Sequence, residues 1–320
     1  MKKEKVTNPK ILRLRLKKLD LASLKYRNKF LDNKTGLYKK KYTERRSCPV
    51  CNSNNKIRIF QKEGGFFVKC NKCTMVYLDP VFKDKELIKY YKNNIPIQSA
   101  ACVMGNDFYD TIYNSGLKII QKHIKSKNKK ILDVGCCSGA FLDIAKKKGW
   151  ITYGTELNKE EYIMAKKNHV VWSDDLGEID FNEKFDAVTF WDVFEHLKKP
   201  TKVLKFIRKI LKKTGVIFLQ IPNSDSLAAK ILREKCNMFD PIEHVNLYNK
   251  DALKFLFTKH KIKILDMVSV IDELNVIKNY LNYEDPYLGS QRKFKQMKFI
   301  NNQNIHMSYS GYKLQVLISL

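Results

Sequence analysis

Four cysteines have the number and spacing of a structural metal site. They form two pairs, Cys48-Pro-Val-Cys51 and Cys70-Asn-Lys-Cys73, in the arrangement C-x₂-C-x₁₈-C-x₂-C. Two such turns can bring four thiolates to tetrahedral positions around one Zn²⁺ ion, and a closed shell of this kind leaves no position for catalysis. Two disulfides are the alternative, but they require an oxidising compartment, and we recognise no export signal. We therefore predict a structural zinc site.

A glycine-rich turn at residues 131–142 is the second chemical feature. An apolar strand containing Asp133 turns through Gly135 and Gly139 into a helix, and glycine lets backbone N–H groups approach a ligand closely. Glu156 follows 21 positions after Gly135 (156 − 135), at the end of a second predicted strand, where an acid can accept hydrogen bonds from ribose hydroxyls. The pattern favours a nucleotide-type cofactor, and a turn that binds nothing is the alternative. Because position 137 is Cys, the glycines do not fit the dinucleotide pattern G-x-G-x-x-G.

A group of acids and histidines follows later strands. Asp192, Glu195 and His196 form a D-x-x-E-H segment, and His244 lies in a downstream polar turn. A histidine near neutral pH can act as a general base, so His244 and His196, with Glu195, are our candidate catalytic residues. A purely structural hydrogen bond is the alternative for each histidine.

In this order, the motifs resemble those of class I S-adenosylmethionine (SAM)-dependent methyltransferases, close to the ubiquinone-pathway O-methyltransferases. The D-x-G-x-x-x-G stretch from Asp133 is similar to the first motif of that family, and residues 185–197 resemble its "FDvv…DvlEHl" segment. Residues 239–249 resemble the Pro-x-x-His turn that often precedes a late helix. The resemblance covers about residues 85–320. It implies an α/β fold and SAM as cofactor.

The resemblance also implies roles for individual residues. Glu156 should bind the ribose and Asp175 the adenine amino group, with Asp174 as its rival, while Cys137 stands where the family usually has glycine. The predicted cofactor-binding residues are Asp133, Gly135, Cys137, Gly139, Glu156, Asp175, Trp191 and Asp192. The acid and histidine group also resembles the residues around a divalent metal in ubiquinone-pathway O-methyltransferases and small-RNA 2′-O-methyltransferases. This likeness implies a possible second divalent metal at Asp192, Glu195, His196 and His244, although Asp192 replaces the usual glutamate.

The N-terminal part indicates a separate module and a class of acceptor. Residues 57–60 and 66–69 read as a β-hairpin between the cysteine pairs, which gives a zinc ribbon. A ribbon that runs into Val-Tyr-Leu-Asp-Pro at 76–80 resembles the N-terminal module of bacterial methyltransferases that act on sugars or secondary metabolites. We expect methyl transfer to a small acceptor (a sugar, a glycan precursor or a quinone-like metabolite), at oxygen. An RNA methyltransferase is the first alternative, and a non-catalytic binding protein that has kept the fold is the second.

These motifs require elements that position them. We predict a Rossmann-like seven-stranded sheet, its last strand antiparallel, with helices on both faces, plus a small N-terminal zinc ribbon. The expected parts are a basic arm at 1–46, the ribbon at 47–80, a helical connector at 81–125 and the SAM-dependent methyltransferase domain at 126–320.

The charge of the chain is extreme, at a formal net +28 over 320 residues. Residues 1–46 carry 17 Lys and Arg against 4 Asp and Glu, and residues 9–26 read as a basic amphipathic helix that RNA or an anionic membrane surface could bind. Only 9 of the 61 basic residues are Arg, so a lysine-rich composition with solvated charges is the competing explanation. We expect no transmembrane segment and a cytoplasmic protein.

Overall fold

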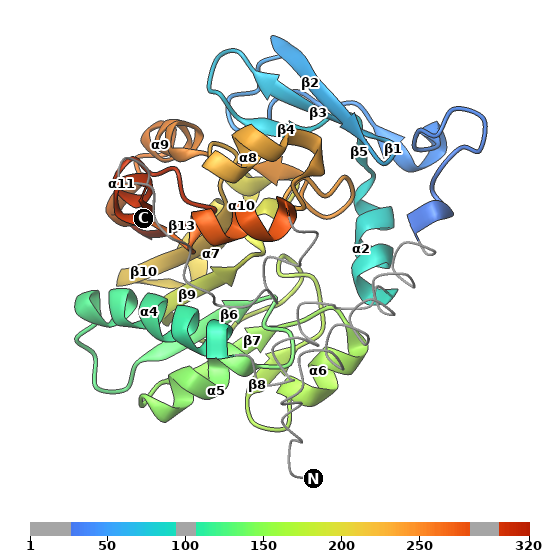
Figure 1. Cartoon of the computed structure of the whole chain (residues 1–320). Coiled ribbons are helices and arrows are strands. Elements are labelled where there is room, and N and C mark those ends of the chain that lie inside the picture. The colour runs from blue at the N-terminus through green and yellow to red at the C-terminus, as the bar shows by residue number, and fades with distance from the viewer. Residues whose placement is uncertain (1–26, 94–106, 282–300) are drawn as a thin grey trace. The chain divides into compact units, whose positions relative to one another are not determined.

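Figure 1 shows a computed structural model of the chain, which describes residues 27–93, 107–281 and 301–320. It divides into two compact units, each described by itself. The first unit comprises Met1–Leu31, Lys85–Trp191 and Phe206–Phe218, and the second comprises Asp32–Asp84, Asp192–Lys205 and Leu219–Leu320.

A seven-stranded sheet has the strand order β12-β13-β10-β9-β6-β7-β8. Strand β6 pairs in parallel with β7 and β9, β7 pairs in parallel with β8, and β13 is antiparallel to β12. The strands are β6 (Lys130–Val134), β7 (Ile151–Thr155), β8 (Val170–Trp172), β9 (Phe185–Trp191), β10 (Leu211–Pro222), β12 (Lys263–Val270) and β13 (Lys313–Ser319). The predicted seven-stranded α/β fold with an antiparallel last strand is confirmed.

The first unit contains the parallel strands and the helices that connect them. Strand β9 is buried at every residue, as expected in the interior of a parallel sheet. The helices of the first unit include α4 (Asp107–His123), α5 (Ala140–Lys147) and α6 (Lys159–Ala165). A Cβ added at Gly116 of α4 would lie 2.4 Å from the Trp191 ring, so the glycine lets this helix approach the end of β9 closely.

The second unit contains the predicted ribbon as part of a four-stranded sheet, with the order β11-β4-β3-β2. The hairpin is β2 (Lys56–Lys62) and β3 (Gly65–Cys70), followed by β4 (Val76–Leu78). The fourth strand, β11 (Asn246–Leu247), was not predicted, and its Asn246 pairs with Tyr77. A segment directly after His244 therefore completes the ribbon sheet.

The remaining described elements are helices and two short strands. They are η1 (Lys40–Tyr42), β1 (Thr43–Glu44), β5 (Val81–Phe82), α2 (Asp84–Asn93), η2 (Phe194–His196), α7 (Pro200–Ile210), α8 (Leu227–Leu232), η3 (Arg233–Lys235), α9 (Lys250–Lys259), α10 (Glu273–Leu281) and α11 (Asn302–Met307). The predicted basic helix at 9–26 lies outside the described residues, and the predicted part boundaries stay a prediction. Within the described ranges, no helix has both the length and the apolar character needed to cross a membrane.

Candidate functional site

The glycine turn joins β6 to α5 with its backbone in the left-handed region. The φ angles of Gly135, Cys137 and Gly139 are 70°, 48° and 87°. The N–H of Gly135 donates to the carbonyl oxygen of Thr155 on β7 at 2.9 Å, which holds the turn against the next strand. A Cβ at Gly139 would lie 2.9 Å from the ring of His169. Both this close contact and the φ of 87° therefore disfavour any residue with a side chain at this position.

Cys137 and Glu156 meet within the same unit. The backbone N–H of Cys137 donates to Oε2 of Glu156 at 3.0 Å, and the N–H of Asn158 donates to Oε1 at 2.7 Å. The carboxylate predicted to bind ribose therefore lies against the glycine turn. Burial raises the pKa of Glu156, and the two N–H donors act in the opposite direction. The family usually has glycine at position 137, and the backbone explains this preference. Cys137 has a φ of 48°, and an L-residue in the left-handed region costs roughly 1–2 kcal/mol.

Asp133 lies on β6, with only 2% of its surface exposed. Its Oδ1 accepts a hydrogen bond from the hydroxyl of Thr189 on β9 at 2.7 Å. Burial raises the pKa of Asp133 to about 8, and the nearby Glu156 acts in the same direction. The observed contact ties β6 to its neighbouring strand, so Asp133 fixes the strand from which the turn starts.

Trp191 and Asp175 occupy opposite environments. Trp191 is 7% exposed, and its ring lies 4.7 Å from that of Phe218 and 5.0 Å from that of Phe141, centroid to centroid. It packs in an aromatic cluster. Asp175 is exposed in the turn after β8, where its Oδ1 accepts from the N–H of Gly177 at 3.0 Å. Their predicted contacts with the cofactor stay predictions.

Asp192 is held in a buried polar network of the second unit. Its Oδ2 accepts from Nζ of Lys313 at 2.5 Å and from Nε2 of Gln220 at 3.0 Å, and Gln315 donates to Gln220 at 2.9 Å. Lys313 is 3% exposed and Asp192 is 9% exposed. Because this network holds its carboxylate, Asp192 does not belong to the group of ligand atoms formed by Glu195, His196 and His244. The inclusion of Asp192 in the predicted metal group is therefore corrected, and metal binding by the other three residues stays a prediction.

These three residues come together as predicted from their types. Oε1 of Glu195 lies 3.8 Å from Nε2 of His196 and 4.0 Å from Nε2 of His244. Glu195 is fully buried, and neither of its carboxylate oxygens has a hydrogen-bond partner among the described residues. Burial raises the pKa of Glu195 and lowers that of His196. A buried carboxylate that faces two imidazole nitrogens is a donor set for a divalent cation.

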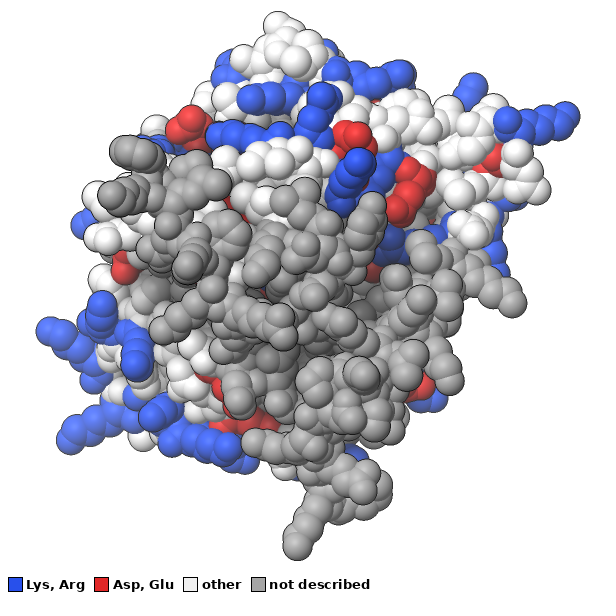
Figure 2. Space-filling view, in the orientation of Figure 1, with Lys and Arg blue, Asp and Glu red and all other residues white. Residues whose placement is uncertain are grey.

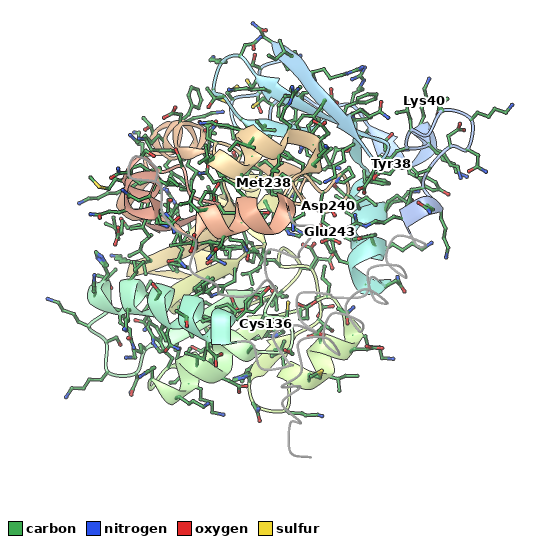
Figure 3. All side chains as sticks on the ribbon, in the orientation of Figure 1. Tyr38, Lys40, Cys136, Met238, Asp240 and Glu243 are labelled. Atoms are coloured by element: carbon green, nitrogen blue, oxygen red, sulfur yellow. The ribbon has the colours of Figure 1, made fainter. Side chains whose placement is uncertain are left out.

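The turn before β11 orients His244. Its Nδ1 donates to the carbonyl oxygen of Met238 at 2.6 Å, which leaves Nε2 of the neutral ring with a free lone pair. Oδ1 of Asp240 accepts from the N–H groups of Ile242 and Glu243, each at 2.8 Å, and so closes the turn. Figure 3 labels Met238, Asp240 and Glu243 close together on this segment. The sequence analysis missed Met238 and Asp240, although Asp-Pro is a known turn signal.

The four cysteines also come together. Two sulfur pairs, Cys48–Cys73 and Cys51–Cys70, lie 3.4 and 3.5 Å apart, and all four sulfurs lie within 4.8 Å of one another. Zn–S bonds of about 2.3 Å in a tetrahedron place sulfurs roughly 3.8 Å apart, so the cluster fits a zinc ion.

The two turns that carry these cysteines share one backbone design. In each turn the first cysteine's carbonyl accepts from the N–H four residues later, Asn52 to Cys48 at 2.9 Å and Thr74 to Cys70 at 3.0 Å. Asn52 and Thr74 also have nearly equal positive φ angles of 62° and 61°. This pseudo-symmetry presents the two cysteine pairs to one point.

Comparison with known proteins decides the family. The model of the methyltransferase-domain family matches residues 71–265, which is more than half of the chain. The chain belongs to this family. It is a class I SAM-dependent methyltransferase, as the glycine turn and the Glu195-His196 segment predicted. This family match favours an enzyme over the second alternative, a non-catalytic binding protein that has kept the fold.

Curated relatives match this methyltransferase over shorter stretches. It is 28% identical over 120 residues to the ubiquinone biosynthesis O-methyltransferase of Coxiella burnetii, covering 33% of this chain and 49% of the relative. The corresponding Haemophilus ducreyi enzyme is 30% identical over 108 residues, covering 30% and 46%. The methyltransferase thus spans about half the length of these relatives. An uncharacterized protein of Methanocaldococcus jannaschii is 26% identical over 190 residues, covering 56% and 79%.

Solved structures of other methyltransferases are also similar to this chain. The plantazolicin methyltransferase BpumL, solved with SAH, has 15% identity and a TM-score of 0.47, covering 72% of this chain and 93% of that one. A SAM-dependent methyltransferase from Clostridium acetobutylicum has 16% identity and a TM-score of 0.43, covering 67% and 98%. The family assignment rests on the sequence match.

Proposed function

We propose that this methyltransferase transfers the methyl group of SAM to an oxygen of a small-molecule acceptor, and that Glu195, His196 and His244 hold a divalent metal ion. The observation that carries the proposal is the environment of Glu195. Leaving a buried carboxylate without hydrogen bonds costs several kcal/mol unless a cation compensates it. The two imidazole nitrogens at 3.8 and 4.0 Å point to a metal ion as that cation.

The proposed SAM site is the glycine turn with Glu156. Gly135 and Gly139 place no side chain at either end of the turn, and the backbone N–H of Cys137 holds the Glu156 carboxylate beside it. Ribose hydroxyls would donate to the Glu156 carboxylate, which already lies beside the turn. A charge-assisted bond of this kind contributes roughly 1.5–3 kcal/mol.

The chain's own residues prepare the proposed metal site. The hydrogen bond to Met238 fixes the ring of His244 with Nε2 available as a ligand, and burial favours the neutral, ligand form of His196. When bound, a divalent ion lowers the pKa of a hydroxyl that contacts it and so makes the oxygen a better methyl acceptor. The remaining task of the protein is to align that oxygen with the methyl group, since displacement at an unhindered carbon depends mainly on positioning.

Two acceptor classes follow from different observations. The relatives named ubiquinone biosynthesis O-methyltransferases support an oxygen acceptor on a small molecule. The proposed range includes sugars, glycan precursors and quinone-like metabolites. The net charge of +28 favours RNA as the second candidate.

Metal content tests the proposal. Elemental analysis of the purified wild type should give two ions per chain after incubation with Mn²⁺, one held by the cysteines and one at Glu195. Glu195→Gln should lose the second ion and keep the first. Glu243→Gln is the matched control, because Glu243 adjoins His244 in the turn before β11 but lies outside the ligand group. Equal metal content in wild type and Glu195→Gln would overturn the metal assignment.

Methyl transfer tests the acceptor. Labelled SAM is incubated with total small metabolites and, separately, with total RNA, each with chelated protein and after Mn²⁺ is restored. We expect metal-dependent label in the small-molecule fraction. Label confined to RNA would establish the second candidate, and full activity of protein shown to lack the second ion would refute the role of the metal.

A further inference from the structure

A basic pocket lies in the second unit, beside the first cysteine turn. Its volume is about 430 Å³, which is within the usual range for small-ligand sites. Its charged lining is six cations and one acid: Arg46, Lys198, Lys199, Lys202, Lys205, Lys259 and Glu44. We propose that this pocket binds the phosphate group of a small phosphorylated ligand.

Specific hydrogen bonds build the pocket walls. Arg46, just before the first cysteine turn, donates from Nε to the carbonyl oxygen of Leu78 at 2.9 Å and from a terminal nitrogen to that of Lys198 at 3.4 Å. Lys259 at the end of α9 donates to the carbonyl oxygen of Val50 at 3.0 Å. These hydrogen bonds hold segments that are far apart in the sequence together around the pocket.

Few of the cations are neutralised by acids. Lys198 pairs with Glu44 at 2.6 Å, and Lys199 pairs with Asp84 at 2.8 Å. The other four cations, by contrast, have no ion pair within the ranges that the structure describes. Arg46 and Lys259 donate to neutral carbonyl oxygens, and the last two cations are Lys202 and Lys205. The pocket therefore concentrates positive charge that a bound anion would compensate.

Lys202 and Lys205 are placed to deliver this charge. They are three residues apart in the first part of α7, so they lie on neighbouring positions of one helix face. Both are exposed. Lysine binds phosphate as a flexible point charge, and the hydroxyl of Thr201 also lines the pocket.

The pocket differs from a general excess of lysine. Figure 2 shows Lys and Arg side chains at the top, the right and the lower left of the view, which fits the net charge. A solvated surface lysine needs no cavity, however, whereas here six cations share one. The limited volume favours a single phosphorylated small molecule over an extended nucleic acid strand.

Titration with ribose 5-phosphate, observed by ³¹P NMR at constant ionic strength, tests the proposal. Ribose serves as the uncharged control, added as a competitor that should not displace the phosphate. We expect saturable binding of ribose 5-phosphate to the wild-type protein. Lys202→Gln/Lys205→Gln should weaken it at least tenfold. Lys209→Gln/Lys213→Gln removes the same charge outside the pocket lining and should leave the affinity within about twofold. SAM binding, measured by calorimetry, should be equal in all three proteins.

Three outcomes would overturn the proposal. They are the absence of saturable binding to the wild type, an equal loss in both double variants, and binding of a 12-nucleotide RNA that ribose 5-phosphate does not displace. The first would mean that the pocket does not bind a phosphate group, and the second that the lysines act only through net charge. The third would make the pocket part of a nucleic acid surface. Because SAM binding and metal content are measured separately, failure here leaves the proposed methyl transfer intact.

Discussion

Removing one member of the buried pair of Lys313 and Asp192 should destabilise the second unit strongly. In Lys313→Met the lysine charge disappears, while the carboxylate of Asp192, which is 9% exposed, stays and still accepts from the neutral amide of Gln220. Removing one member of a buried ion pair costs about 3–5 kcal/mol, because the remaining charge is uncompensated. We expect the free energy of unfolding of Lys313→Met to fall by this amount.

The partner substitution separates charge from packing. Asp192→Asn/Lys313→Met removes both charges and keeps an amide that Gln220 can bond, so we expect it to lie within about 1 kcal/mol of the wild type. The interaction free energy from the double-mutant cycle should therefore exceed about 2 kcal/mol. Lys212→Met is the control, because its partner Asp186 also accepts from the N–H of Lys130, and Lys212 is one-third exposed. A partly exposed pair should cost about 1 kcal/mol or less.

Urea unfolding followed by far-UV circular dichroism measures these differences. A cost below about 1 kcal/mol for Lys313→Met would contradict the reasoning, since it would mean that water reaches the carboxylate. Equal destabilisation of Lys313→Met and the double variant would also contradict it, because the loss would then come from packing of the lysine stem.

Three further predictions concern the glycine turn. Cys137→Gly should raise the free energy of unfolding by about 0.5–1 kcal/mol in the same urea assay, because glycine adopts φ 48° without the steric cost of a Cβ. A variant less stable than the wild type would contradict this, since it would show that the cysteine side chain packs favourably. Glu156→Gln should weaken SAM binding, measured by calorimetry, roughly 10- to 100-fold through loss of a charge-assisted hydrogen bond. The control Glu160→Gln, in the first turn of α6, should bind SAM as the wild type does. Unchanged SAM affinity in Glu156→Gln would exclude the role of Glu156 in binding the ribose. Asp133 has its pKa raised from 3.8 to about 8, so the folded state binds more protons than the unfolded state between these values, and its contribution to stability is lost as pH rises. Asp133→Asn should therefore gain stability relative to wild type as pH rises from 4 to 8, and a pH-independent difference would refute the raised pKa.

Local sequence patterns were enough to predict much of the site. The glycine turn is a strand, a tight turn and a helix in direct succession, so residue types alone indicated its conformation. The two cysteine pairs lie in turns whose bonds span four residues, and their spacing was sufficient to predict that they converge. Glu195 and His196 were also found locally, since they are adjacent.

Contacts between distant segments decided the rest. The sequence grouped Asp192 with Glu195 because they are three residues apart, but Lys313, 121 residues away, holds its carboxylate instead. Lysine in an apolar strand was a signal that a buried partner existed, without identifying it. Likewise, only the pairing of Asn246 with Tyr77 showed that the turn after His244 completes the ribbon sheet.

The sequence by itself determined the methyltransferase family, the strand-turn-helix cofactor turn and the cysteine cluster, because each depends on residues that are near neighbours along the chain or repeat a local spacing. Only the tertiary structure decided which acid joins the two histidines, where Lys313 lies and that six cations enclose one pocket. The physical reason is that burial and charge pairing depend on distances in space between residues far apart in sequence, and no local pattern specifies those distances.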